Sequence, residues 1–294
     1  MSPTQPSDLE SEPFRLERPA RQTVPFLFAS PHSGRSYPAS LLARTRLDAT
    51  TLRRSEDAFV DELFAGAVSL GAPLLSAHFP RAFLDVNRNM AELDAGMFDG
   101  ALGVPVDAPS PRVAAGLGVI PRIVRDGAEI YRGKLDSGEA AARLSQLYKP
   151  YHQALAALME ETRARFGVAV LIDCHSMPSA LSVPDIVLGD RYGASAAPQL
   201  TARAEAAFAR EGFSVARYTP YAGGHTTALY GKVASNCHAL QIEINRALYL
   251  DEDKIAKKAA FETVRARLTR AMQTLTAMPL SQLGRPDSLP EAAE

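Results

Sequence analysis

The chain has 294 residues, of which 46% are hydrophobic and 22% charged, and its formal net charge at pH 7 is −1. This composition is typical of a soluble globular protein with ample apolar material for a core. The near-zero charge gives no basic field for nucleic acid and no polybasic run for a membrane surface, so we expect neither partner. With two cysteines, the chain has no secreted disulfide framework.

The two ends of the chain differ in composition from the rest. Residues 1–13 and 283–294 are rich in Pro, Ser, Glu and Ala, and we expect both to be flexible tails. The N-terminal segment has no apolar signal core, and no later apolar run is long enough to span a bilayer. We therefore expect a cytoplasmic protein whose residues 14–282 form a single domain. The sequence leaves its oligomeric state open.

The clearest structural signal is the apolar run at residues 168–172, which ends at Asp173 and His175. An uninterrupted run of this length, rich in β-branched residues, predicts a strand buried on both faces of a sheet. Residues 24–30 form a second such run, which leads to His32. Ligands bind where the carboxyl ends of such strands open into loops, so two histidines at one sheet edge suggest a metal site.

The remaining elements follow in chain order from apolar periodicity and turn residues. We predict further strands at residues 73–77, 185–189, 213–217 and 239–246. Helices are predicted at residues 55–71, 138–166, 196–210 and 261–275, with a kink at Pro150. Residues 91–138 are rich in Gly, Pro and Asp, and we expect long functional loops with one β-hairpin around residues 123–131. The alternation of strands and helices predicts one α/β domain, three layers deep.

A catalytic zinc ion usually takes three His or carboxylate ligands and leaves one position for water. His32 and His175 are candidate nitrogen ligands, and Glu56 and Asp57 offer a carboxylate close to His32 in the chain. Each residue also has an ordinary explanation. A histidine in a strand-end loop more often makes only a hydrogen bond, and acids after Ser55 suit any helix N-terminus. Spacing alone leaves both interpretations open.

Glu243 lies in the predicted strand at residues 239–246, on the face opposite Ile242 and Ile244. A carboxylate in an otherwise buried strand is costly to ionise unless it is paired or used. Glu243 is therefore either an ion-pair partner, for instance of Arg246, or a general base for a metal-activated water.

Arg81, Asn87 and Arg88 form a second polar cluster after the strand at residues 73–77. The planar guanidinium fork suits carboxylates, so the cluster suggests an anionic substrate, although ordinary surface ion pairing explains it equally well.

A pair of glycines precedes a third group of polar residues. Gly224, His225 and Thr226 offer backbone N–H groups and a hydroxyl to a ligand, but a Gly-Gly pair is equally often only a turn. We interpret Cys174 as a small core residue. The remaining histidines lack comparable settings and receive no role: His78, His152 and His238.

With these residues assembled, the chain resembles the N-formylglutamate amidohydrolase family, which is related in fold to the zinc carboxypeptidases and aspartoacylases. The matching segments span most of the chain: residues 30–34, 55–61, 85–88, 173–176 and 241–244. The resemblance implies a three-layer α/β/α sandwich around a mixed, mostly parallel sheet, like that of the zinc carboxypeptidases.

The resemblance also implies one zinc ion per chain, or another divalent metal in its place. His32 and His175 would be ligands, with the third ligand from Glu56 or Asp57. Asp57 is favoured because family members carry an acid at that position. Glu243 would match the general base of the zinc carboxypeptidases.

The same resemblance implies roles for the arginine cluster. Arg88, with Asn87, would match a clamp for the substrate carboxylate, and Arg81 would polarise the scissile carbonyl. The protein would then be a zinc-dependent hydrolase acting on a small anionic N-acyl amino acid. The first candidate is N-formyl-L-glutamate, cleaved to formate and L-glutamate in the last step of one histidine-degradation route. The alternatives are another N-acyl amino acid or small peptide, or a non-catalytic protein that binds a carboxylate ligand.

Overall fold

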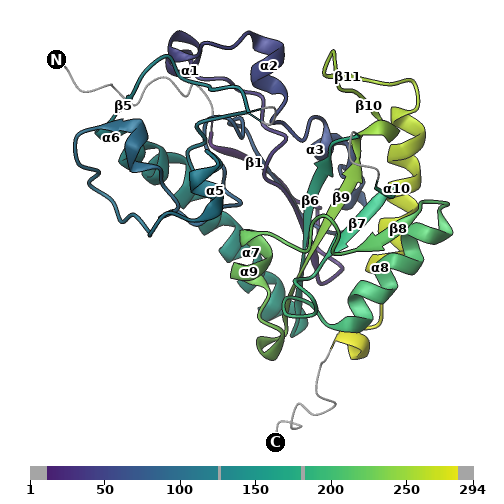
Figure 1. The fold of residues 1–294 in the computed structure, drawn as a ribbon. Helices are drawn as coiled ribbons and strands as arrows, with labels where there is room; N and C mark the ends of the chain where they lie inside the picture. Colours follow the sequence, from purple (N-terminus) through teal and green to yellow (C-terminus); the bar gives the residue numbers. More distant parts are fainter. Residues whose placement is uncertain (1–11, 125–126, 180–182, 284–294) are drawn as a thin grey trace, which may run out of the picture.

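The computed structural model describes residues 12–124, 127–179 and 183–283. Within these ranges, a seven-stranded sheet in the order β1-β3-β2-β6-β9-β7-β8 forms the centre of the molecule (Figure 1). Its strands are β1 Phe14–Glu17, β2 Phe26–Ser30, β3 Leu74–Ala77, β6 Ala169–Met177, β7 Ile186–Gly189, β8 Val215–Arg217 and β9 Cys237–Asn245. Two further pairs are small: β4 Phe98–Asp99 with β5 Leu135–Asp136, and β10 Leu250–Asp251 with β11 Ala256–Lys257.

The sheet is mixed but mostly parallel. Strands β3, β2, β6 and β9 run parallel to one another, while β1 is antiparallel to β3 and β7 is antiparallel to β9. Every residue of β2 and β6 is buried, as expected for central strands covered on both faces. The predicted fold class, a three-layer sandwich around a mixed sheet, is confirmed.

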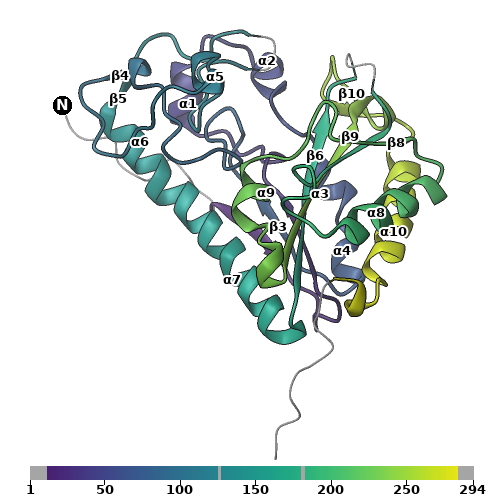
Figure 2. The same cartoon turned by 60° about the horizontal axis from the view of Figure 1, so that its bottom comes forward.

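Helices cover both faces of the sheet (Figure 2). They are α1 Ala39–Arg44, α2 Ala49–Arg53, α3 Val60–Leu63, α4 Gly66–Ser69, α5 Pro111–Ala114, α6 Ser137–Arg143, α7 Lys149–Phe166, α8 Pro198–Arg210, α9 His225–Tyr230 and α10 Phe261–Thr276. One apolar core packs β6 residues Val170 and Ile172 against α3, α4, α8 and α10. The other packs Ala169 and Leu171 against α7 and the loops before it. No helix among the described residues is long and apolar enough to cross a bilayer.

The predicted helix at residues 55–71 is wrong over its first five residues, and the remainder forms two four-residue helices, α3 and α4. The N–H of Asp57 donates to the carbonyl oxygen of His32 at 2.9 Å, which ties this backbone to the loop after β2. Phe59 then takes a left-handed conformation, with φ 63°, and α3 begins only at Val60. A tertiary hydrogen bond therefore overrides the local helical periodicity.

The predicted long helix at residues 138–166 is found as α6 and α7, joined by a π-helical segment at Leu144–Tyr148. Pro150 has no N–H and lies in the first turn of α7, so the irregularity directly before it has a local cause.

Three other predictions need correction or refinement. β6 does not end before Asp173 but pairs with β9 as far as Met177, so Asp173 and His175 lie within the strand. The segment with the Gly-Gly pair is not only a turn, because the short helix α9 begins directly after it at His225. The expected hairpin at residues 123–131 is present in its described part but is short: Ile123 and Glu129 form an antiparallel bridge, and the N–H of Ile130 donates to the carbonyl oxygen of Arg122 at 2.8 Å. Residues 125–126 lie outside the described ranges.

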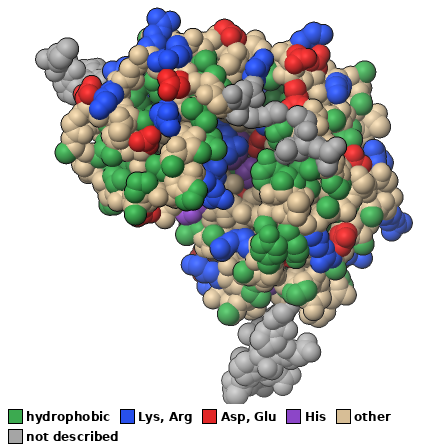
Figure 3. All heavy atoms as spheres, in the orientation of Figure 1, with side chains coloured by type: hydrophobic (Ala, Val, Ile, Leu, Met, Phe, Trp, Pro, Cys, Tyr) green, Lys and Arg blue, Asp and Glu red, His purple; other side chains and the backbone are tan. Residues whose placement is uncertain are grey.

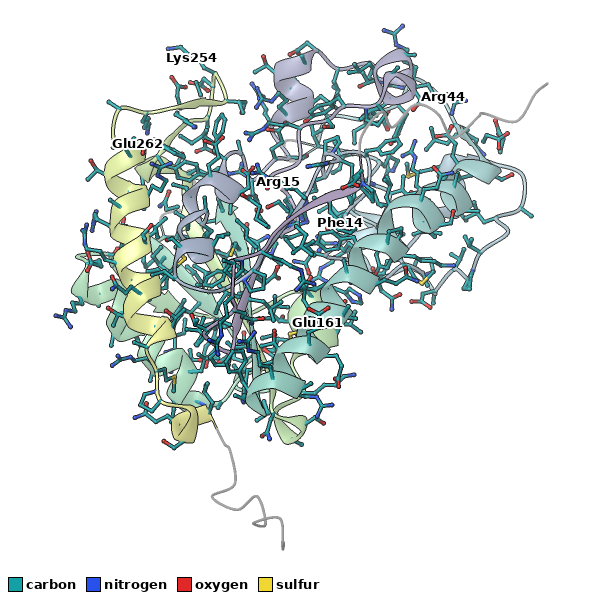
Figure 4. All side chains as sticks on the ribbon, turned by 180° about the vertical axis from the view of Figure 1, so that it is seen from behind. Phe14, Arg15, Arg44, Glu161, Lys254 and Glu262 are labelled. Carbon is teal, nitrogen blue, oxygen red and sulfur yellow. The ribbon has the colours of Figure 1, made fainter. Side chains whose placement is uncertain are left out.

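The ends of the domain pack against its body. Phe14 of β1 meets Tyr151 of α7 edge to face, with ring centroids 6.5 Å apart (Figure 4). Leu283 is fully buried at the other end of the chain. Most of the two expected tails, residues 1–11 and 284–294, lies outside the described residues, and the domain boundaries stay a prediction.

The loop after β2 passes so close to another backbone segment that Gly34 has no room for a side chain. A Cβ at Gly34 would overlap the carbonyl oxygen of Phe79 and lie 2.7 Å from that of His78, which already accepts a hydrogen bond from the N–H of Ser36. We expect Gly34→Ala to lower the free energy of unfolding by about 1–3 kcal/mol.

Gly103→Ala is the matched control for this prediction, because a Cβ at Gly103 would meet nothing within 4 Å. We expect its effect to stay within about 0.5 kcal/mol. Urea denaturation measures both variants, and equal midpoints would contradict the steric argument.

Candidate functional site

The carboxyl ends of β2, β6 and β9 meet at one edge of the sheet. His32 follows β2, while His175 of β6 and Glu243 of β9 are direct neighbours in the parallel register. Alternation along β6 places Asp173 and His175 on the same face as Leu171. Figure 3 shows a hollow on this side of the molecule, with basic, acidic and histidine side chains at its floor.

Three buried side chains converge at this edge. Oδ2 of Asp57 lies 3.3 Å from Nδ1 of His32 and 3.1 Å from Nδ1 of His175. One ligand atom from each residue lies within 4.8 Å of the other two. The imidazole rings are 4.9 Å apart. Two nitrogens and one carboxylate oxygen so placed form a group that can bind a metal ion.

The second nitrogen of each ring also faces a carboxylate. Nε2 of His32 donates to Oδ1 of Asp85 at 2.7 Å, and Nε2 of His175 lies 3.0 Å from Oδ2 of Asp173. Burial disfavours a charged ring, yet the carboxylates of Asp173, Asp57 and Glu243 raise the pKa of His175 well above its ordinary value. Outer carboxylates of this kind fix the orientation of metal-binding imidazoles.

Arg246 holds the other oxygen of Asp57. Its Nη2 donates to Oδ1 of Asp57 at 2.9 Å and its Nε donates to Oγ of Ser176 at 3.1 Å. Burial opposes ionisation of Asp57, but the hydrogen bonds from His175 and His32, with the charge of Arg246, hold its pKa well below the ordinary value. Oδ1 is thus occupied, and Oδ2 is the oxygen that faces the histidines.

Glu56 points elsewhere. It accepts hydrogen bonds from Tyr37 at 2.6 Å and from Nε and Nη2 of Arg53 at 3.0 and 3.1 Å. Of the two acids that the sequence left open, the structure brings Asp57 to the histidines.

Glu243 is buried beside His175. Its Oε1 accepts a hydrogen bond from Nε2 of Gln241 at 2.8 Å, while Arg246, the suggested ion-pair partner, instead bonds to Asp57. Burial raises the pKa of Glu243 to about 7, against the opposing effects of His175 and two arginines.

The predicted arginine cluster surrounds Asp85. Nε of Arg81 donates to Oδ2 of Asp85 at 3.0 Å, and Nη2 of Arg88 lies 3.8 Å from the same oxygen. Two other nitrogens of Arg88, Nε and Nη1, donate to the carbonyl oxygens of Leu117 and Asn87. Burial opposes the charge of Asp85, but the two arginines and His32 hold its pKa well below the ordinary value.

The start of α9 closes one side of this region. Oδ1 of Asn87 accepts from the N–H of Thr226 at 2.8 Å, and Nδ2 of Asn87 lies 3.3 Å from Nε2 of His175. A Cβ at Gly224 would lie 2.6 Å from the amide of Asn87, so this close approach requires glycine. Nε2 of His225 lies 3.2 Å from the hydroxyl of Tyr148. The predicted Gly224, His225 and Thr226 therefore do lie beside the other site residues.

Sequence reasoning gave no role to three residues that organise the site. Asp85 lies two residues before Asn87, and the sequence analysis included it only in residues 85–88, one of the segments that carry the family resemblance. Asp173 was noted at the sheet edge without a function. Arg246 was considered only as a partner for Glu243, because its bond to Asp57 joins residues 189 positions apart.

Comparison with known proteins identifies the family. The family model for N-formylglutamate amidohydrolase matches residues 24–250. An N-formylglutamate deformylase of Pseudomonas aeruginosa is 32% identical over 268 residues, which cover 87% of this chain and 94% of that protein. An N-formylglutamate deformylase of Pseudomonas putida is 29% identical over 238 residues, which cover 78% of this chain and 83% of that protein.

Solved structures give the same result. The crystal structure of an N-formylglutamate amidohydrolase from Ralstonia eutropha JMP134 superposes with a TM-score of 0.84 at 34% identity, covering 90% of this chain and 96% of that one. A gene product of Agrobacterium tumefaciens shares the fold, with a TM-score of 0.63 at 19% identity over 92% and 98% of the two chains. The chain belongs to the N-formylglutamate amidohydrolase family.

Proposed function

We propose that the protein is a zinc-dependent amidohydrolase that removes the formyl group from an N-formylated acidic amino acid. N-Formyl-L-glutamate is the leading substrate, with formate and L-glutamate as products, as in the last step of one histidine-degradation route. The main support is the convergence of His32, Asp57 and His175 on one point with Glu243 beside them. The names of the two Pseudomonas relatives support the choice of substrate.

The donor atoms of the three converging residues fit a divalent ion. Two imidazole nitrogens and a carboxylate oxygen are a usual ligand set for catalytic zinc. A metal ion would take the place of the Nδ1 proton of His32: without that proton, Nε2–H still donates to Asp85, and the lone pair of Nδ1 faces a second acceptor, Oδ2 of Asp57, at 3.3 Å. A cation between two such acceptors relieves their repulsion. We therefore infer one zinc ion per chain, held by His32, Asp57 and His175, with another divalent metal as the alternative.

The surrounding residues supply the rest of the chemistry. A divalent ion at this position would polarise a carbonyl oxygen and acidify a water molecule. Glu243 takes the proton of the attacking water and delivers it to the leaving amine. Arg81 donates to the carbonyl oxygen as negative charge develops on it. Asn87 and Arg88 hold a substrate carboxylate and thereby orient the amide, with Gly224, His225 and Thr226 beside them.

Two alternatives use the same residues. The machinery would also serve a different N-acyl amino acid or a small peptide, since its chemistry acts on the amide and not on the side chain. In a binding protein, the arginines would hold a carboxylate ligand and Glu243 would have no chemical task.

Removal of either histidine should remove the metal. We expect about one zinc per chain in protein purified without added metal or chelator, and a loss of most of it in His32→Ala and His175→Ala. Elemental analysis of the purified proteins measures this. His78→Ala is the control, because that ring contacts the carbonyl oxygen of Glu12 outside the site. Full zinc content in both site variants would overturn the assignment.

The two neighbouring acids provide a matched pair. Asp57→Asn should weaken zinc affinity strongly, whereas Glu56→Gln should leave it within a few fold, because Glu56 bonds to Tyr37 and Arg53 instead. Competition with a zinc-binding dye measures both affinities. A larger loss in Glu56→Gln would assign the third ligand to Glu56.

Glu243→Gln separates an enzyme from a binding protein. Loss of the general base should lower kcat for N-formyl-L-glutamate by about 100- to 10,000-fold, while zinc content stays at the wild-type value. Formate release measures turnover, and elemental analysis measures zinc. Unchanged kcat in the zinc-loaded variant would remove Glu243 from the mechanism. Wild-type protein that binds the compound without releasing formate would favour the binding protein.

A further inference from the structure

A polar cleft of about 350 Å³ lies beside the start of α9. Its walls include Arg112 of α5, Arg191 after β7, and the backbone of Gly223, Gly224 and His225. No role has been assigned so far to either arginine. The position, the backbone and the charge of Arg191 together indicate what this cleft binds.

The cleft begins one side chain away from the proposed metal ligands. Gly224 of the cleft wall packs directly on the amide of Asn87, and that amide lies 3.3 Å from Nε2 of His175. The backbone carbonyl oxygen of Arg88, the proposed carboxylate clamp, accepts a hydrogen bond from the hydroxyl of Tyr148, which lies 3.2 Å from Nε2 of His225 in the cleft wall. A substrate bound at both places would have to extend past Asn87.

The backbone at Arg191, which lies in this wall, has an unfavourable conformation. Arg191 and Tyr192 both have left-handed conformations, with φ 55° and 57°, which residues with a Cβ rarely adopt. The N–H of Arg191 donates to the carbonyl oxygen of Ala222 at 2.6 Å, which pins the strained turn. Strain of this kind clusters at ligand sites, where the surrounding structure enforces it.

Gly223 makes room for the stem of this arginine. A Cβ on Gly223 would lie 2.7 Å from Cγ of Arg191, so only glycine lets the side chain lie across the 222–224 backbone. The backbone of Gly223 in turn rests on Gly189, where a Cβ would lie 2.6 Å from its nitrogen. Close packing at Gly189 and Gly223 thus places the start of the Arg191 side chain at the cleft wall.

The guanidinium of Arg191 has no ion pair or hydrogen bond among the described residues, unlike the arginines near the metal site. Arg81 is bonded to Asp85, and Arg88 donates from two of its nitrogens to backbone carbonyls. Of the two acids lining the cleft, Glu92 accepts hydrogen bonds from the N–H of Asn89 and from Ser110, and Asp107 is exposed. Arg191 is exposed to solvent at the cleft wall, so its guanidinium is accessible to an anion from outside the protein.

We propose that this cleft binds the second carboxylate of a dicarboxylic substrate and that Arg191 is the residue that selects for it. The inference rests on the proposed function, since an N-formylated acidic amino acid carries two carboxylates and Arg88 is proposed for one of them. A guanidinium with free donors binds a carboxylate through charge-assisted hydrogen bonds and discriminates against a neutral amide of the same shape.

The test compares N-formyl-L-glutamate with N-formyl-L-glutamine, its neutral isostere. We expect Arg191→Gln to lower kcat/KM for the glutamate compound by roughly 10- to 100-fold and to change that for the glutamine compound less than about threefold. Arg112→Gln, which removes the same charge from another residue of the cleft lining, should change the ratio of the two kcat/KM values less than about threefold. Arg191→Lys should restore part of the preference.

Several results would overturn the proposal. One is an unchanged preference in Arg191→Gln, and another is an equal loss for both substrates. A third is that Arg112→Gln changes the ratio of the two kcat/KM values as much as Arg191→Gln does, which would mean that long-range charge alone sets the preference.

A binding measurement separates this proposal from the proposed function. If wild-type protein hydrolyses neither compound, the proposed function fails, and the cleft is then tested by calorimetric titration with glutarate and butyrate. We expect glutarate to bind more tightly than butyrate in the wild type, and Arg191→Gln to abolish most of that difference. No difference between the two acids, or one that survives in Arg191→Gln, would refute the role of Arg191 independently of turnover.

Discussion

The shared carboxylate of Asp57 is the interaction on which the site depends. Arg246 holds one oxygen and the two histidines face the other, so a single buried acid joins the residue after β9, the loop after β2 and the carboxyl-terminal part of β6. A buried carboxylate is costly unless every lone pair is matched by a donor or a cation. The strand order brings the required partners to Asp57, because neighbouring parallel strands end at the same edge of the sheet and point alternate side chains to the same face. The pairing of His175 with Glu243 follows from that register and needs no loop to position it.

Much of this architecture could be predicted from sequence, because apolar runs report burial directly. The runs before His32 and His175 predicted the two central strands, and the expectation that both bring a histidine to one sheet edge followed from how parallel strands bind ligands. The choice between Glu56 and Asp57 could not be made in the same way. It depends on Tyr37, 19 positions from Glu56, and on a hydrogen bond from Asp57 back to His32. That same hydrogen bond interrupts the helix that periodicity predicts. The contact that brings Asp57 to the histidines is therefore also the reason why the helix prediction failed.

The roles of Asp85 and Arg246 were hidden for a related reason. Each acts on a residue far away in the chain, Asp85 on His32 and Arg246 on Asp57. A sequence without an alignment reports what a residue is but not what it touches, and an acid or an arginine near a strand end has many ordinary explanations. Only the folded arrangement shows that these side chains complete hydrogen bonds around the converging histidines. Residues that position others are therefore the least predictable part of such a site, although they come from the same elements as the predicted ones.

The arginines divide into two groups by what their nitrogens already bind. Arg81, Arg88 and Arg246 already neutralise carboxylates or donate to backbone carbonyls, so the protein itself holds these three side chains in place. Arg191 instead is exposed, with its backbone N–H bonded to the carbonyl oxygen of Ala222 and its Cγ against Gly223. In the proposed role, holding the backbone and the start of the side chain in this way would reduce the entropy lost when a carboxylate binds. Under this proposal, the catalytic residues lie at the sheet edge and the residue that selects the substrate lies on the cleft wall. A substitution on the wall would then alter substrate selectivity without disturbing the buried charges at the sheet edge.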